Sequence, residues 1–119
     1  MMILVIDDNR DLADLFCEYL SHQHYPAIAA YSGEQGIAIA KEQAPKVILC
    51  DIAMAGMDGY EVARFIRSDG SLKHIKLIAV SGFFSPEDVE RSLQAGFDQH
   101  LCKPVDLQEM TKMLASCLA

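Results

Sequence analysis

Acidic, hydroxyl and amino side chains suited to phosphorus chemistry follow short apolar runs of this sequence. Asp7 and Asp8 follow the first run, Asp51 and Ser81 follow two later runs, and Lys103 follows the last. If the runs are strands of one sheet, three carboxylates come together, and a pair about 4 Å apart costs roughly 4 kcal/mol at an effective dielectric of about 20. A divalent cation with oxygen ligands would remove this repulsion. Mg²⁺ is the expected ion, and Mn²⁺ is the second choice.

A carboxylate held beside a divalent cation and a lysine is a good nucleophile for phosphorus. The cation and Lys103 would spread the charge that develops on a transferring phosphoryl group. Each residue alone has an ordinary interpretation: Asp7-Asp8 as an acidic helix start beside an Asn9 cap, Asp51 as a turn residue, Ser81 as a loop hydroxyl. Their joint position on four predicted strand ends favours a functional site.

Five apolar runs are the elements that must position these side chains. Each has the length of a strand. Apolarity that is continuous rather than alternating predicts strands buried on both faces, as in a parallel sheet. The runs are Met2–Ile6, Ala27–Ala30, Val47–Cys50, Leu77–Val80 and His100–Cys102 with its flank.

Amphipathic segments between the runs predict five helices. Residues 12–20 follow the helical spacing i, i+3, i+4, and Val62, Phe65 and Ile66 mark the apolar face of the third helix. The other helices carry start and stop signals. These are a capping-box pattern at Ser32–Gln35, Ser85 before Pro86, Gly96 as a C-terminal stop, and Asp106 as an N-cap.

The alternation of five strands and five helices predicts one doubly wound α/β domain over residues 1–119. Pro26 opens the second strand, and proline is tolerated at the edge of a sheet. This suits a five-stranded parallel sheet in the order 2-1-3-4-5, the flavodoxin-like arrangement. In such sheets ligands bind beyond the carboxyl ends of the strands, so these ends should carry the chemistry.

Composition argues against several classes of function. The net charge of −7 does not suit binding to the phosphate backbone of a nucleic acid. No stretch reaches the ~18 apolar residues of a membrane helix, and no signal peptide is evident, so the cytoplasm is the expected location. The four cysteines form no CxxC pair, and Cys50 and Cys102, both in apolar runs, are expected to be buried.

The motifs of the chain resemble those of response-regulator receiver domains. Val5–Asn9 is similar to the opening of that family, Asp51–Glu61 to its phosphoacceptor segment, and Ala95–Asp98 with Lys103–Pro104 to its closing signature. The resemblance covers the whole chain, and the joint set of motifs is highly specific. It implies a two-component signalling domain.

The resemblance implies a role for each acidic residue of the predicted site. Asp51 would accept a phosphoryl group from a histidine kinase or a phosphotransfer domain. Asp8 and Asp51 would bind Mg²⁺ directly, together with the backbone carbonyl of Ala53, and Asp7 would act through a metal-bound water. The domain would then change conformation to control a partner or an output domain, rather than turn over a substrate as an enzyme.

The resemblance also implies roles at the last two strand ends. Lys103 would contact the phosphoryl group, and Ser81 would donate a hydrogen bond to it. The Lys103–Pro104 peptide bond would be cis. Ser81 and His100 would form the conformational switch, although His100 stands where the family often has Tyr or Phe, and a histidine can titrate.

Loop residues near the predicted site raise further expectations. Ala55 stands where the family usually has proline, so the loop loses a fixed φ. Of the adjacent pair Phe83-Phe84, one is expected in the core and the other at an exposed surface for a partner. Ala53 and Phe83, two residues after the phosphoacceptor and the switch serine, would leave no side chain to orient a hydrolytic water.

Other functions compete with the receiver interpretation. A flavin-binding protein shares the architecture but needs a Ser/Thr/Gly-rich phosphate loop where Asp7-Asp8-Asn9 stands. Mg²⁺-dependent phosphohydrolases with an aspartate nucleophile resemble one another in a second acid two residues after it, where this chain has Ala53. A pseudo-receiver that only binds partners would not need the acid, hydroxyl and lysine set. Residues 96–106 resemble receivers fused to hybrid histidine kinases, and the output partner is not readable from the sequence.

Overall fold

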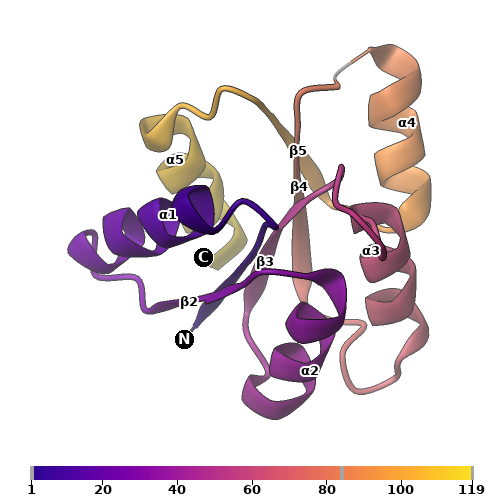
Figure 1. Cartoon of the computed structure of the whole chain (residues 1–119), viewed down its shortest axis with the longest axis horizontal. Coiled ribbons are helices and arrows are strands. Elements are labelled where there is room, and N and C mark those ends of the chain that lie inside the picture. The colour runs from indigo at the N-terminus through magenta and orange to yellow at the C-terminus, as the bar shows by residue number, and fades with distance from the viewer. Residues whose placement is uncertain (1, 84, 119) are drawn as a thin grey trace.

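Five strands and five helices alternate along the chain in a computed structural model that describes residues 2–83 and 85–118 (Figure 1). The elements are β1 (Ile3–Ile6), α1 (Arg10–His22), β2 (Ala27–Ala30), α2 (Gly33–Gln43), β3 (Val47–Asp51), α3 (Gly59–Ser68), β4 (Lys76–Ser81), α4 (Pro86–Ala95), β5 (Gln99–Cys102) and α5 (Leu107–Leu118). Every predicted strand and helix is present. Among the described residues, every helix is too short or too polar to span a lipid bilayer.

The strands form one parallel sheet in the order β2-β1-β3-β4-β5, which confirms the predicted fold. The central strands β1 and β3 are buried along their whole length, whereas the edge strands β2 and β5 are only half-buried. Continuous apolarity therefore identified the central strands for the expected physical reason. Burial on both faces favours apolar side chains along these strands, up to Asp51 at the end of β3.

The sheet separates two apolar cores. Helices α1 and α5 cover one face, and α2, α3 and α4 cover the other (Figure 1). Successive strand residues alternate between the cores, so that Leu4 and Ile6 face α2 and α3 while Ile3 and Val5 face α1 and α5. Packing of the helices on both faces thereby fixes the positions of the carboxyl ends of the strands.

Side chains cap the starts of all five helices. Four of these caps were predicted: Asn9 at α1, Ser32 at α2, Ser85 at α4, and Asp106 at α5, which accepts the Gln108 and Glu109 N–H groups. Asn9 caps α1, and Ser85 with Asp88 forms a reciprocal capping box at α4. At α2 only half of the predicted box forms: Ser32 accepts the Gln35 N–H, but the Gln35 side chain accepts from the Tyr31 N–H. The box that begins α3, between Asp58 and Glu61, was not predicted.

Arg67 on α3 holds together the segments before β4 and after α4. Its guanidinium donates to the Gly96 carbonyl at 2.9 Å, to the Lys73 and Ile75 carbonyls at 2.7 and 2.6 Å, and to the Asp98 carboxylate at 2.8 Å. Asp98 also accepts the Leu77 N–H. These charge-assisted bonds fix the C-terminal end of α4 to the sheet.

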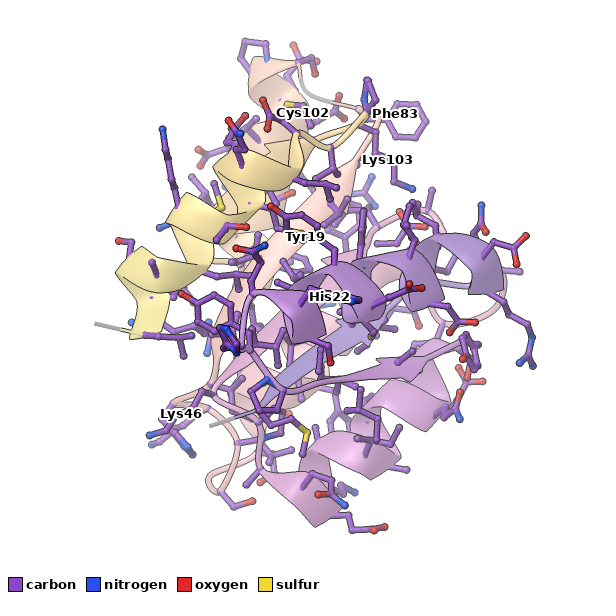
Figure 2. All side chains as sticks on the ribbon, turned by 90° about the vertical axis from the view of Figure 1, so that its left-hand side faces the viewer. Tyr19, His22, Lys46, Phe83, Cys102 and Lys103 are labelled. Atoms are coloured by element: carbon purple, nitrogen blue, oxygen red, sulfur yellow. The ribbon has the colours of Figure 1, made fainter. Side chains whose placement is uncertain are left out.

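The cysteine prediction is half right. Cys50 is buried in the core, but Cys102 is exposed, so its predicted burial is wrong. Cys102 ends the edge strand β5 (Figure 2), and the side-chain alternation that buries Leu101 against α1 and α5 turns Cys102 to the opposite face, at the exposed end of the strand. The apolar run that contains Cys102 does not indicate that β5 lies at the edge of the sheet.

Candidate functional site

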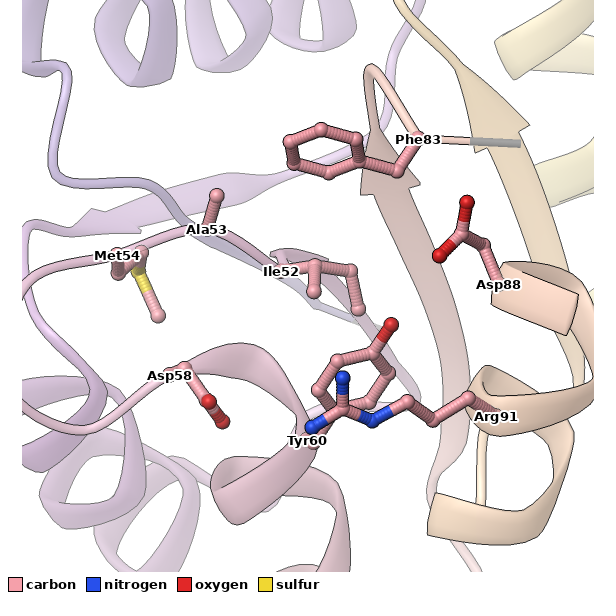
Figure 3. A pocket seen from close by; sticks show the side chains of 8 residues that line it. All are labelled: Ile52, Ala53, Met54, Asp58, Tyr60, Phe83, Asp88 and Arg91. Carbon is pink, nitrogen blue, oxygen red and sulfur yellow. The ribbon is translucent and has the colours of Figure 1, made fainter. Parts of the chain in front are cut away.

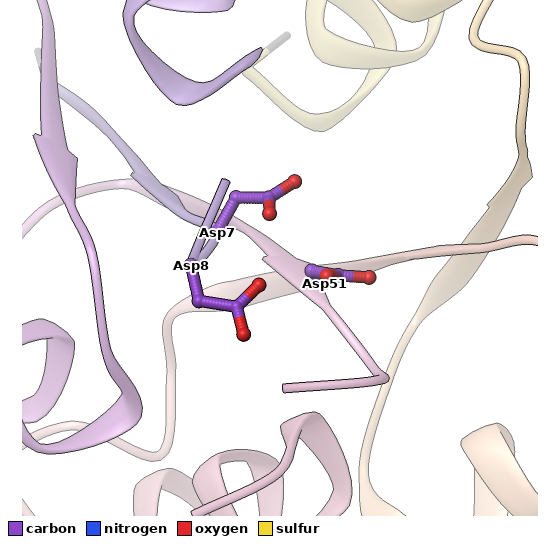
Figure 4. A group of neighbouring side chains, drawn as sticks. All are labelled: Asp7, Asp8 and Asp51. Carbon is purple, nitrogen blue, oxygen red and sulfur yellow. The ribbon is translucent and has the colours of Figure 1, made fainter. Parts of the chain in front are cut away.

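Four strand ends bring the predicted site residues to one edge of the sheet. Asp7 and Asp8 directly follow β1, Asp51 ends β3, Ser81 ends β4, and Lys103 follows β5. Figure 4 shows the carboxylates of Asp7, Asp8 and Asp51 extending into one region beyond the strands. The convergence follows from the parallel sheet, because all carboxyl ends lie on the same side.

The three carboxylates form a compact cluster. One oxygen of each of Asp7, Asp8 and Asp51 lies within 4.8 Å of the others. Asp7 is 2% exposed and accepts the Asn9 N–H at 2.9 Å. Asp8 is exposed and accepts the Ala55 N–H at 3.2 Å, which ties the loop after β3 to the end of β1. Both contacts orient the acids toward Asp51.

Lys103 supplies the positive charge that faces this cluster. Its Nζ donates to Asp51 Oδ1 at 3.2 Å and lies 3.9 Å from Asp7 Oδ2. The Lys103 backbone N–H donates to the Ser81 carbonyl at 2.8 Å, which continues the β4–β5 ladder to the site. The Lys103–Pro104 peptide bond is cis, as the family resemblance implied.

Asp51 has a perturbed acidity. It is 5% exposed, and burial with the charge of Asp7 raises the pKa of its carboxyl from 3.8 to about 6, although Lys103 acts in the opposite direction. One ammonium group does not balance three carboxylates. The site therefore holds excess negative charge in a place that water screens poorly.

The donor set fits a hard divalent cation. The cluster offers only oxygen atoms, and Mg²⁺ takes one or two carboxylates together with waters and phosphate oxygens. Such a cation would also neutralise the charge that raises the pKa of Asp51. The cluster can hold a metal ion, whereas the direct role of Ala53 and the water-mediated role of Asp7 stay predictions.

Ser81 lies where β4 turns into the loop before α4. It is buried, and its Oγ accepts the Phe83 N–H at 2.9 Å. The hydroxyl hydrogen is free to donate to a group bound at the cluster. His100 does not join the site: its ring contacts Ser92 on α4. The structure therefore places Asp7, Asp8, Asp51, Ser81 and Lys103 at the carboxyl ends of the strands, and His100 beneath α4.

A pocket of about 460 Å³ opens beside the cluster, between the loop after β3 and the start of α4. Its wall includes Ala53, Phe83, Tyr60 and Arg91 (Figure 3). Phe83 is 61% exposed and its ring extends toward Ala53, as expected of one member of the aromatic pair. Phe84, the other member, lies outside the described residues.

Sequence reasoning missed the groups that shape this pocket. The Arg91 guanidinium lies 4.3 Å from the centre of the Tyr60 ring and joins α4 to α3. Gly59 lets α3 begin against the chain that carries the phosphoacceptor candidate, because a Cβ there would lie 2.5 Å from the Asp51 carbonyl oxygen. The Asp58-Gly59 dipeptide was the available signal for Gly59, whereas no local pattern pairs Arg91 with Tyr60.

The family model described as "Response regulator receiver domain" matches residues 3–115 of the chain. The polar-differentiation response regulator DivK of Brucella ovis is 30% identical over 116 residues, covering 98% of this chain and 94% of DivK.

Solved structures show the same fold. The chemotaxis protein CheY4 of Vibrio cholerae superposes with a TM-score of 0.92 at 23% identity, covering 98% of this chain and 97% of that one. A CheY-like receiver domain protein of Methanospirillum hungatei gives a TM-score of 0.89 at 26% identity, covering 97% and 90% of the two chains.

Proposed function

Because this chain belongs to the response regulator receiver domain family, we propose that Asp51 accepts a phosphoryl group from a phosphohistidine of a histidine kinase or phosphotransfer domain. The observation that carries the proposal is the buried Asp51 carboxylate, which is bonded to Lys103 and clustered with two further acids. This arrangement suits a nucleophile in phosphoryl transfer.

Asp51 acts as the nucleophile in this proposal. One carboxylate oxygen forms a bond to phosphorus, the bond between phosphorus and the donor's imidazole nitrogen breaks, and the electron pair leaves with that nitrogen. The positive charge of Lys103 lies beside the oxygens of the transferring phosphoryl group, and the Ser81 hydroxyl donates a hydrogen bond to one of these oxygens. Neither residue gains or loses a proton in the step.

Asp7, Asp8, Asp51 and the Ala53 carbonyl would hold Mg²⁺, with Asp7 acting through a water; Mn²⁺ offers the same preference for oxygen ligands. Bound there, the ion supplies charge neutralisation to the carboxylates and to the incoming phosphoryl oxygens. In its absence, Asp51 would meet an anionic donor with a partly protonated carboxyl and uncompensated neighbours.

The chain is a signalling domain, and we propose that its chemistry is limited to its own phosphorylation and dephosphorylation. Residues 1–119 would form one receiver domain in the cytoplasm, and phosphorylation would change the contacts of an output domain or a target protein. The domain would act either as a stand-alone regulator or as part of a larger protein, since residues 96–106 resemble the receivers of hybrid kinases. The Asp7-Asp8-Asn9 segment disfavours a flavin, because it directs carboxylates to the place of a phosphate loop.

The test uses a small phosphodonor such as acetyl phosphate. With Mg²⁺, mass spectrometry should show the gain of one phosphoryl group, and peptide mapping should locate it on Asp51. With EDTA the gain should disappear, and excess Mg²⁺ should restore it. Equal labelling with and without the metal, or a label on another residue, would contradict the proposal.

We further expect phosphorylated Asp51 to hydrolyse slowly. A water must align behind phosphorus, and the side chains that flank this approach, Ala53 and Phe83, offer it no hydrogen bond. The Phe83 ring extends toward Ala53 (Figure 3), and in this proposal it shields the approach. Ala53→Asn combined with Phe83→Glu should speed loss of the phosphoryl group at least about tenfold, a barrier change of roughly 1.4 kcal/mol.

The measurement is the decay of phosphorylated protein after donor removal at fixed Mg²⁺. Leu93→Glu provides the control, because it introduces the same acid at an exposed apolar position of α4. Its decay should match that of the unaltered chain. Equal decay in the double variant would refute the shielding by Phe83 and leave Asp51 as the phosphoacceptor.

A further inference from the structure

Helix α4 makes a polar contact with the sheet. Its fully buried residues are Ser92 and Ala95, whereas α3 buries Tyr60, Val62, Ala63 and Ile66. Small and polar side chains remove little apolar surface from water, so this contact contributes little to holding the helix. The position of α4 therefore depends strongly on the individual groups beneath it.

His100 on β5 is the polar group beneath Ser92. The Ser92 side chain is 1% exposed, and its Oγ lies 3.2 Å from His100 Nδ1. His100 Nε2 is the one buried side-chain nitrogen or oxygen without a hydrogen-bond partner among residues 2–83 and 85–118. The imidazole thus has one nitrogen paired with α4 and the other enclosed without a partner.

This geometry distinguishes the protonation states of the ring. In the neutral tautomer with hydrogen on Nδ1, the N–H donates to Ser92 Oγ, and Nε2 is a bare acceptor. Protonation places a second N–H on Nε2, where the packing provides no acceptor, and an unpaired buried donor is costly, more so with a charge. The protonated ring fits the docked position of α4 worse than the neutral ring does.

Among residues 2–83 and 85–118, the hydrogen-bond partner of the His100 ring is Ser92, and no carboxylate bonds to it. On β4, Ala79 lies opposite His100, and on β5 the thiol of Cys102 shares its face. The charged groups nearby already have partners or face solvent. They are Asp88, bonded to Ser85; Asp98, bonded to Arg67; Arg91, placed on Tyr60; and the exposed Glu87 and Glu90.

We propose that His100 is a pH-sensitive latch for α4: the neutral ring holds the helix on the sheet through Ser92, and protonation loosens it. Histidine is the side chain whose charge most readily changes near neutral pH. The loop from Ser81 leads directly into α4, so a proton on His100 and a group bound at Ser81 would act on the same helix. The latch itself requires no phosphoryl transfer.

The test is NMR on the unphosphorylated, metal-free protein, so its outcome is independent of the proposed phosphoacceptor function. The His100 ring signal and the amide signals of residues 88–95 should titrate with one midpoint. Protection of these amides from hydrogen exchange, corrected for intrinsic rates, should fall at least about tenfold between about pH 7.5 and 5.5, since an unpaired buried donor is costly.

His100→Phe and His100→Gln should both abolish the titration of the α4 amides. Either variant alone tests the proposal, because both remove the titratable group. Glutamine keeps an amide that can bond to Ser92, and phenylalanine keeps an aromatic ring. The control replaces the exposed His22, His24 and His74 with glutamine and should titrate like the unaltered chain. Amides of α4 that still titrate without His100, or that stay constant while the His100 ring titrates, would overturn the proposal.

Discussion

Asp51→Asn should reduce phosphoryl labelling by acetyl phosphate with Mg²⁺ by at least about a hundredfold, because removing even one hydrogen-bond donor to a transition state costs that much. Asparagine keeps the shape of the side chain and an oxygen for Lys103, but its neutral amide is a poor nucleophile. Asp7 cannot take over, because its carboxylate is bonded to the Asn9 N–H and lies 3.9 Å from Lys103.

The measurement is the rate of mass gain at fixed donor and Mg²⁺ concentrations. Asp11→Asn makes the same chemical change on the exposed first turn of α1, close to the site, and should label normally. A variant at position 51 that gains a phosphoryl group at the rate of the unaltered chain, on Asp7 or Asp8, would refute the assignment of the nucleophile.

Without metal, Asp51 should destabilise the fold as pH rises. The pKa of its carboxyl is about 6 in the folded chain against 3.8 ordinarily, so between these values the folded state keeps a proton that the unfolded state has released. Stability is therefore highest at and below about pH 4 and is lost as pH rises through 6. At 1.36 kcal/mol per unit the loss is about 3 kcal/mol, and solvent screening at the exposed Asp8 reduces it to about 2 kcal/mol.

Urea unfolding of the unaltered chain and of Asp51→Asn should isolate this effect. The two proteins should have similar stability near pH 4, and the variant should be more stable by about 2 kcal/mol at pH 7. Saturating Mg²⁺ should stabilise the unaltered chain at pH 7, because the ion binds the folded carboxylates, and should stabilise the variant less.

Glu42→Gln is the matched control, since it neutralises an exposed acid on α2. Its stability should differ from that of the unaltered chain by roughly 0–1 kcal/mol at every pH. A constant difference between Asp51→Asn and the unaltered chain from pH 4 to 7 would contradict the perturbed acidity of Asp51. This result bears on the electrostatics of the site and is separate from the labelling result.

The sequence predicted the fold because its signals are local. Strand burial, capping residues and the stop at Gly96 each depend on a few neighbouring residues, and the parallel order then determines where the strand ends meet. Strands β3 and β4 continue one residue beyond their apolar runs, to Asp51 and Ser81, because backbone pairing with β4 and β5 includes these polar residues. The polar residues that follow the apolar runs therefore indicated the site, but apolarity alone did not show that the strands include them.

The features that the sequence did not reveal depend on long-range contacts. Arg67 binds carbonyl groups far along the chain, and Arg91 finds Tyr60 across two helices; neither leaves a periodic pattern. The exposure of Cys102 follows from the edge position of β5. The orphaned nitrogen of His100 results from packing against Ser92, so the sequence alone identified only an unusual residue type there.

The hydrogen bonds of Arg67 hold one end of α4 in place. Gly96, at the C-terminal end of the helix, is anchored to α3, whereas the N-terminal end continues into the loop with the exposed Phe83. The 10 residues of α4 span about 15 Å, so a small rotation about Gly96 moves its first turn furthest. A change at the strand ends would therefore displace the first turn of α4 more than its anchored C-terminal end.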